Sequence, residues 1–167
     1  PFYEQLGKVK SLETIQFSIQ THRGCYGECN FCAIAVHEGR CIASRSKESI
    51  VQEALSFTKN PDFKGIIHDV GGPTANMYGI ECSKKLKSGS CKHIRCLFPG
   101  KCKAMPIDHA EQIELLKSIR TLPSVRKAFV GSGIRFDMVL DDRVHGEEYL
   151  KTIVDHHVSG QLKIAPE

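Results

Sequence analysis

The chain has 167 residues, of which 41% are hydrophobic and 25% are charged, and its formal net charge at pH 7 is +4. These values are typical of a single soluble globular domain, and no run approaches the 18 apolar residues that a membrane-spanning helix needs. Eight cysteines without a secretory signal peptide favour reduced thiols and a cytoplasmic location. Both ends look like cuts through a larger domain, so we expect a central fragment of a longer protein.

The first half of the chain predicts two strands and one helix. Residues 15–20 alternate between apolar and polar, which is typical of a half-buried strand. Ser46 can cap a helix that carries apolar residues on one side and ends at residues 60–61, an Asn-Pro pair. The apolar run 65–70 predicts a second strand, which the Gly-Gly-Pro sequence at 71–73 stops.

The second half continues the alternation of helices and strands. Asp108 and Glu111 predict a capping box at the start of a helix. Residues 125–130 predict a third strand, 147–157 a further helix and 161–165 a fourth strand. This order is typical of an α/β fold with a parallel sheet, either doubly wound or part of a (β/α) barrel. A complete eight-fold barrel needs about 250 residues, so the chain is long enough for about half of one.

A cysteine-rich loop follows the first predicted strand, with the sequence GCYGECNFC at residues 24–32. Cys25, Cys29 and Cys32 lie on a turn rich in Gly and Asn, where three thiols can face one point. A soft metal centre uses thiolates in this way, which indicates iron and sulfur. A four-iron cluster needs four ligands, so a loop that supplies three leaves one iron open to another molecule. Zinc ligation and unrelated buried cysteines are the alternatives.

A second group of cysteines lies in a basic segment, which we treat as an insertion over residues 80–105. Its cysteines are Cys82, Cys91, Cys96 and Cys102. No acidic residue lies between Glu81 and Asp108, whereas seven cations do: Lys84, Lys85, Lys87, Lys92, Arg95, Lys101 and Lys103. The thiols could hold zinc or an auxiliary iron–sulfur cluster, form disulfides or stay free. The cations suit phosphates, which gives a rival hypothesis of a metal-stabilised nucleic-acid-binding module.

The spacing Cys-x3-Cys-x2-Cys, with Phe31 before the last cysteine, resembles the signature of the radical S-adenosylmethionine (SAM) enzymes. The resemblance implies that the three cysteines hold a four-iron, four-sulfur cluster whose open iron binds SAM. It further implies reductive cleavage of SAM to a 5′-deoxyadenosyl radical, which abstracts hydrogen from a substrate. The family fold implies a partial (β/α) barrel of about four parallel strands, with the cluster loop at its C-terminal face.

Residues for SAM are suggested at the ends of the predicted strands. Gly71 and Gly72 match a Gly-Gly-Glu-like element that contacts the amino group of SAM in the family, but Pro73 replaces the acid, so backbone carbonyls would make the contact. A simple turn is the alternative. The neighbouring His68 and Asp69 suit substrate contacts and structural hydrogen bonds equally well.

The third and fourth predicted strands end in further polar residues. Ser132 and Arg135 could meet the ribose or the carboxylate of SAM, and a turn with a surface Arg is the alternative. Glu167 lies where the family often places a polar residue for the ribose hydroxyls.

Four longer motifs resemble the YgiQ-type, UPF0313 branch of the radical SAM proteins. They lie at residues 18–25, 69–78, 95–99 and 156–167. The resemblance implies SAM, an unidentified substrate, and an electron donor such as a flavodoxin or a ferredoxin. A partial barrel leaves strand edges unpaired, so we also expect self-association.

Overall fold

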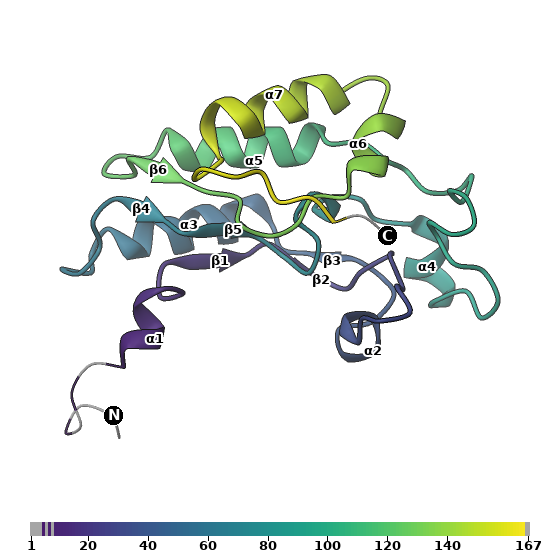
Figure 1. Ribbon diagram of the computed structural model, residues 1–167, viewed down its shortest axis with the longest axis horizontal. Helices are drawn as coiled ribbons and strands as arrows, with labels where there is room; N and C mark the ends of the chain where they lie inside the picture. The colour runs from purple at the N-terminus through teal and green to yellow at the C-terminus, as the bar shows by residue number, and fades with distance from the viewer. Residues whose placement is uncertain (1–4, 6, 8, 166–167) are drawn as a thin grey trace.

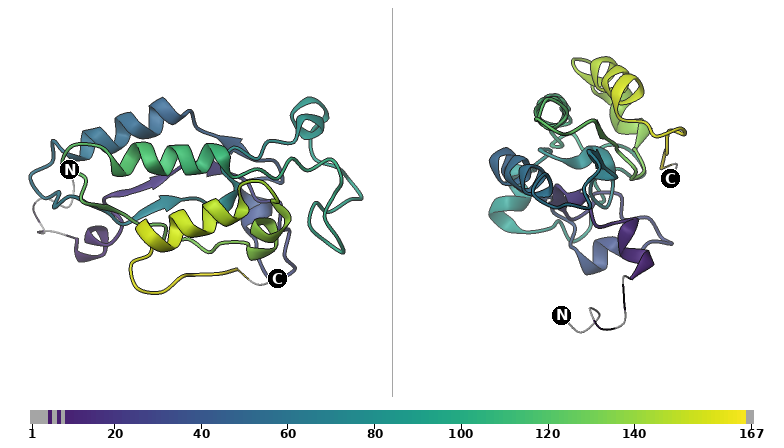
Figure 2. Two further views of the ribbon diagram at one scale, coloured as in Figure 1. Left: turned by 90° about the horizontal axis from the view of Figure 1, so that it is seen from above. Right: turned by 90° about the vertical axis from the view of Figure 1, so that its left-hand side faces the viewer.

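The computed structural model describes residues 5, 7 and 9–165. Three helices, α3 (Lys47–Phe57), α5 (Ala110–Arg120) and α7 (Gly146–His156), follow one another in an arc on one side of the strands (Figure 1 and Figure 2, right). α5 packs against both α3 and α7. Among the described residues, no helix is long and apolar enough to cross a membrane.

Short parallel strands form the middle of the molecule: β1 (Ser18–Gln20), β4 (Ile66–Ile67), β5 (Asp69–Gly71) and β6 (Lys127–Ala128). β1 pairs with β5 in parallel, and β4 pairs with β6 in parallel. The His68 N–H donates to the Phe17 carbonyl (2.9 Å) and the Val70 N–H to the Phe129 carbonyl (2.8 Å). Residues 66–71 therefore lie between the other two strands. The described residues do not close into a barrel, so a partial barrel stays a prediction.

The fourth predicted strand is much shorter than the sequence suggested. Residues 161–165 contribute a single parallel bridge, between Ile134 and Ile164, because the hydrogen bonds do not continue along the segment. The capping box was also wrong. α5 begins at Ala110, and Asp108 accepts from the Ala110 N–H (2.8 Å) instead of capping deeper in the helix. The predicted cap of α3 is confirmed, since the Ser49 N–H donates to Ser46 Oγ (3.2 Å).

The remaining elements are short and lie mostly near one end of the strands. α1 (Lys10–Glu13) precedes β1, and β2 (His22–Arg23) pairs antiparallel with β3 (Ala43–Ser44). The others are α2 (Ile34–His37), the 3₁₀ turn η2 (Ala75–Met77), α4 (Ser83–Ser88) and α6 (Phe136–Asp141). Two-residue strands give no readable period, so the sequence did not reveal the antiparallel pair.

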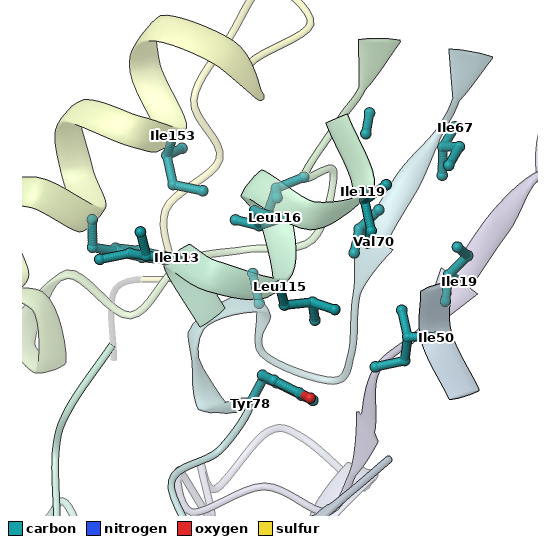
Figure 3. Close-up of a cluster of buried hydrophobic side chains, with 14 of the residues drawn as sticks. Ile19, Ile50, Ile67, Val70, Tyr78, Ile113, Leu115, Leu116, Ile119 and Ile153 are labelled. Carbon is teal, nitrogen blue, oxygen red and sulfur yellow. The ribbon is translucent and has the colours of Figure 1, made fainter. Parts of the chain in front are cut away.

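Two apolar clusters hold these elements together. The larger one lies between the strands and helices α3, α5 and α7, as Figure 3 shows; it includes Ile19, Ile50, Val70, Leu116 and Ile153. The second cluster lies around the cysteine-rich loop and includes Cys25, Tyr26, Ile42, Met77, Ile80, Cys82, Cys96, Met105 and Met138. The segment 80–105 thus contributes to the core around the loop.

Candidate metal centre

The cysteine-rich loop is bent by residues in the left-handed backbone region. Gly24 has φ +86°, and a Cβ added to it would lie 2.0 Å from the Cys41 carbonyl oxygen, so only glycine fits. Glu28 has φ +52° and forms an ion pair with Arg40. Left-handed conformations are unfavourable for a residue such as Glu and collect at functional sites. These bends fold the chain back between β2 and β3.

The loop brings the thiols of Cys25 and Cys29 close to Gly27. A Cβ added to Gly27 would lie 3.1 Å from Cys29 Sγ and 3.4 Å from Cys25 Sγ. The Gly27 N–H donates to Cys25 Sγ (3.4 Å), and the hydroxyl of Thr74 lies 3.4 Å from the same sulfur. Cys32 is tied to this group through its N–H, which donates to the Cys29 carbonyl (3.0 Å).

The spacing of the thiols argues against a single metal ion. In tetrahedral zinc sites the Zn–S distance is about 2.3 Å, which places the sulfurs about 3.8 Å apart. Among the described residues, Cys25, Cys29 and Cys32 do not bring three ligand atoms within 4.8 Å of one another. In a four-iron cluster each thiolate ligates a different iron, which separates the sulfurs further. The three thiols are thus not gathered around the position of a single tetrahedral ion, and an iron–sulfur cluster there stays a prediction.

The two glycines predicted to contact SAM are required by packing. A Cβ at Gly71 would lie 2.7 Å from Ser132 Oγ, and one at Gly72 would lie 2.5 Å from the ring of His22. The Gly71 carbonyl already accepts from the N–H (2.7 Å) and the hydroxyl (3.1 Å) of Thr21. Gly72 is thus the better candidate for a carbonyl contact with a ligand.

Ser132 is held in place by Asp69. The Ser132 hydroxyl donates to Asp69 Oδ2 (2.7 Å), and Asp69 Oδ1 accepts from the N–H groups of Gly131 (2.7 Å) and Ser132 (3.3 Å). Asp69 therefore stabilises the turn after β6, which is the structural alternative left open for it. His68 is exposed on the other side of the strand.

Arg135 is brought to the cysteine-rich loop, although the two lie more than 100 residues apart. The residue is only 5% exposed, and its Nη1 lies 3.4 Å from the position of an added Cβ on Gly27. Its Nε donates to Asp137 Oδ1 (2.9 Å), and its Nη2 pairs with Oδ2 of the same carboxylate. Burial raises the pKa of Asp137, but the hydrogen bonds and charge of Arg135 outweigh this and lower it. Glu167, the other predicted contact, lies outside the described residues.

The second cysteine group is divided between core and surface. Cys82 and Cys96 are buried in the cluster around the loop, Cys102 packs at its margin, and Cys91 is half-buried outside it. These four cysteines form no disulfide with one another. No three of them, all of which the structure describes, bring their sulfurs within 4.8 Å of one another. A metal site there stays a prediction, and the geometry favours a packing role for Cys82 and Cys96.

The basic segment is not uniformly a surface for anions. Lys85 is 3% exposed; its ammonium donates to the Arg40 carbonyl and lies 4.8 Å from the centre of the Tyr26 ring. Burial raises the pKa of Tyr26 to about 12 and also raises the pKa of Cys96, where Lys85 opposes the effect in part. Lys101 pairs with Asp141 (3.3 Å). Two of the seven cations are thus engaged within the protein.

Sequence reasoning missed a buried polar network beside Arg135. Asn76 in η2, His109 before α5 and Asp142 after α6 are all buried. In the sequence, Thr74 and Asn76 follow the glycines after β5, but nothing there shows that His109 and Asp142 join Asn76. Their contacts are described below.

Comparison with known proteins identifies the family of the chain. No protein-family model matches it. All 167 residues align at 57% identity with a UPF0313 protein of Fusobacterium nucleatum subsp. nucleatum. They align at 51% and 50% with UPF0313 proteins of Clostridium perfringens and Clostridium botulinum. The chain belongs to the UPF0313 family. The predicted UPF0313 resemblance is thereby confirmed, and the chain spans 29%, 25% and 26% of the lengths of these three relatives.

Proposed function

We propose that this UPF0313 chain is part of a radical SAM enzyme, with a four-iron, four-sulfur cluster held by Cys25, Cys29 and Cys32. One observation carries the proposal: a strained loop after β1 gathers the Cys25 and Cys29 thiols around Gly27, beside the buried guanidinium of Arg135. A disordered or purely structural loop would not need three thiols, a left-handed Glu28 and an adjacent cation in one place.

The residues around the loop would divide the work of binding. Bound there, the cluster would supply the electron that cleaves SAM. The Gly27 N–H and the Thr74 hydroxyl contact Cys25 Sγ and would orient it toward the cluster. Arg135 would hold the carboxylate of SAM through the charge-assisted bonds that guanidinium groups form. Gly72 would offer its carbonyl to the amino group, and Ser132, fixed by Asp69, would face the ribose.

The wider setting follows from the same hypothesis. The parallel strands and the arc of helices would form one part of a (β/α) barrel, and the electron donor would be a small redox protein such as a flavodoxin or a ferredoxin. Unpaired strand edges would promote self-association of the isolated chain.

The nucleic-acid hypothesis has less support. Lys85 is buried and Lys101 pairs with Asp141, so five of the seven cations of segment 80–105 remain for phosphates. Binding of single-stranded nucleic acid also uses aromatic side chains on which bases stack, and Phe98 is the one aromatic residue in this segment apart from a histidine.

The test is formation of 5′-deoxyadenosine from SAM by anaerobically reconstituted protein under a strong reductant. We expect product from the unsubstituted chain, none from Cys29→Ala, and unchanged product from Cys41→Ala, which removes a half-buried thiol outside the three-cysteine motif. No product from reconstituted protein that binds SAM would contradict the proposed reaction, and equal product from Cys29→Ala would contradict the ligand assignment.

A further inference from the structure

A hydrogen-bonded chain of three buried side chains ends on the backbone of Arg135. Asp142 Oδ2 lies 2.7 Å from His109 Nδ1, and His109 Nε2 lies 3.1 Å from Asn76 Nδ2. Asn76 and His109 are 0% and 1% exposed, and Asp142 is 7% exposed. The three residues lie in η2, before α5 and after α6, so the chain links segments that are distant in sequence.

Asn76 contacts both polar groups of the Arg135 backbone. The Arg135 N–H donates to Asn76 Oδ1 (2.8 Å), and Asn76 Nδ2 donates to the Arg135 carbonyl (3.0 Å). A backbone N–H can only donate and a carbonyl can only accept, so these two bonds fix the orientation of the Asn76 amide. This pair of bonds sets the position of Arg135 at the start of α6.

The same logic fixes the protonation of His109. Because Asn76 Nδ2 is a donor, His109 Nε2 has to accept, and the ring proton then lies on Nδ1, from which it is donated to Asp142. Burial lowers the pKa of His109, and the bond with Asp142 opposes this only in part, so the ring is neutral at pH 7. Burial alone would raise the pKa of Asp142, but hydrogen bonds from His145, His109 and Val144 lower it to about 2. The contacts of His109 with Asn76 and with Asp142 therefore require the same tautomer, with the ring proton on Nδ1.

Two simpler readings of the network are weaker. Asp142, Asp108 and His145 bring three ligand atoms within 4.8 Å, as a cation site would. However, Asp142 Oδ1 accepts from the N–H groups of Val144 (3.1 Å) and His145 (2.9 Å), and His145 Nδ1 lies 2.9 Å from Asp108 Oδ1. Hydrogen bonds thus account for the cluster. A role in stability alone does not explain why this hydrogen-bond network ends at Arg135, whose buried guanidinium reaches Gly27 of the cysteine-rich loop.

We propose that Asp142, His109 and Asn76 are positioning residues that hold Arg135 so that its guanidinium faces the cysteine-rich loop and binds an anionic group there. This inference depends on the proposed function for the identity of that group, the carboxylate of SAM. It does not depend on it for the geometry: the backbone of Arg135 is fixed from one side by Asn76, and its guanidinium by the bidentate pair with Asp137. Without the contact between Asn76 and the Arg135 backbone, the Arg135 guanidinium and its partner Asp137 could turn away from the loop.

The test compares two buried histidines. His109→Leu removes the middle of the chain. His157→Leu removes an equally buried ring, whose Nδ1 lies 2.6 Å from the Ala128 carbonyl in the opposite part of the molecule. Both variants should lose thermal stability, but only His109→Leu should weaken SAM binding to reconstituted protein, by about tenfold or more. Asn76→Asp, which keeps the shape and replaces the donor, should behave like His109→Leu.

Nuclear magnetic resonance of the unreconstituted protein provides a readout without the cluster. We expect His109 at pH 7 to carry its proton on Nδ1, and the Arg135 Nε resonance to shift in Asn76→Asp but not in His157→Leu. Three results would each overturn the positioning role. These are a His109 proton on Nε2, an Arg135 Nε resonance that does not shift in Asn76→Asp, and a SAM affinity of both His109→Leu and Asn76→Asp within about twofold of that of His157→Leu. If the unsubstituted protein binds no SAM, the proposed function fails, and the two resonance measurements still decide the positioning role.

Discussion

Substitution of Gly27 by Ala should separate stability from cofactor binding. Gly27 has no positive φ, so alanine can adopt its backbone conformation. At such a site the change stabilises a protein by about 0.4–1 kcal/mol, because the unfolded chain loses freedom. The new methyl would lie 3.1 Å from Cys29 Sγ and 3.4 Å from Cys25 Sγ and Arg135 Nη1, so these groups must move by a few tenths of an ångström.

The two effects oppose each other in the metal-free protein. We expect its free energy of unfolding to change by no more than about 1 kcal/mol in either direction, which corresponds to about 2–4 °C in melting temperature for a chain of this length. Cluster binding should respond far more, because the methyl would lie against both thiols that we propose as cluster ligands. Iron and acid-labile sulfide after anaerobic reconstitution should fall to less than about half of the unsubstituted level.

The control for this prediction is Gly100→Ala. Gly100 also lacks a positive φ, and nothing lies within 4 Å of its added Cβ. Its stability and its iron content should both stay close to those of the unsubstituted protein. If Gly27→Ala retains as much iron and sulfide as Gly100→Ala, the space around Gly27 is not where the cluster binds, and the reasoning from geometry is refuted.

Three further predictions concern the surroundings of the loop. In chemical denaturation, Gly24→Ala should lower the free energy of unfolding by more than about 2 kcal/mol, because it combines a positive φ with a backbone clash at 2.0 Å. Gly39→Ala, which has a positive φ but open space around the added Cβ, should lower it by about 1 kcal/mol. Equal losses in the two variants would refute the clash. Burial lowers the pKa of His22 from 6.5 to about 4, so the unfolded chain binds more protons than the folded protein between these pH values. The free energy of unfolding therefore decreases as the pH is lowered through this range. The unsubstituted protein should therefore lose about 2 kcal/mol from this residue between pH 7 and pH 5, and His22→Gln should lose correspondingly less; parallel losses would contradict the assignment. Cys96→Ser should lower the free energy of unfolding by about 1–3 kcal/mol, because it buries a hydroxyl, and Cys91→Ser should lower it by less than about 0.5 kcal/mol. Equal losses in the two variants, with zinc bound to the unsubstituted protein, would support the four-cysteine metal site instead.

The features carried by local sequence were predictable. Ser46 begins α3 as expected, and the helix over 147–157 is observed one residue earlier at both ends, as Gly146–His156. The spacing of Cys25, Cys29 and Cys32 predicts a metal-binding loop, and that assignment stays a prediction. In each case the deciding contacts lie within a few residues, so the pattern in the sequence contains them.

The features that depend on long-range contacts were not predictable. The position of Arg135 beside Gly27 and the network from Asp142 to Asn76 join segments more than 30 residues apart, and no local period records them. Lys85 was taken for one of seven surface cations, but its alkyl chain is covered and its ammonium lies over Tyr26. The fourth strand reduces to one bridge because its neighbour pairs with it only at Ile134.

The central claim is that Cys25, Cys29 and Cys32 hold an iron–sulfur cluster, and metal analysis tests it most directly. After anaerobic reconstitution we predict about four iron and four sulfide per chain, with electronic absorption typical of a cluster. Each single Ala variant of the three cysteines should lose most of both, and Cys41→Ala should lose neither. Full iron and sulfide in a Cys29→Ala variant, or zinc without sulfide in the unsubstituted protein, would contradict the account.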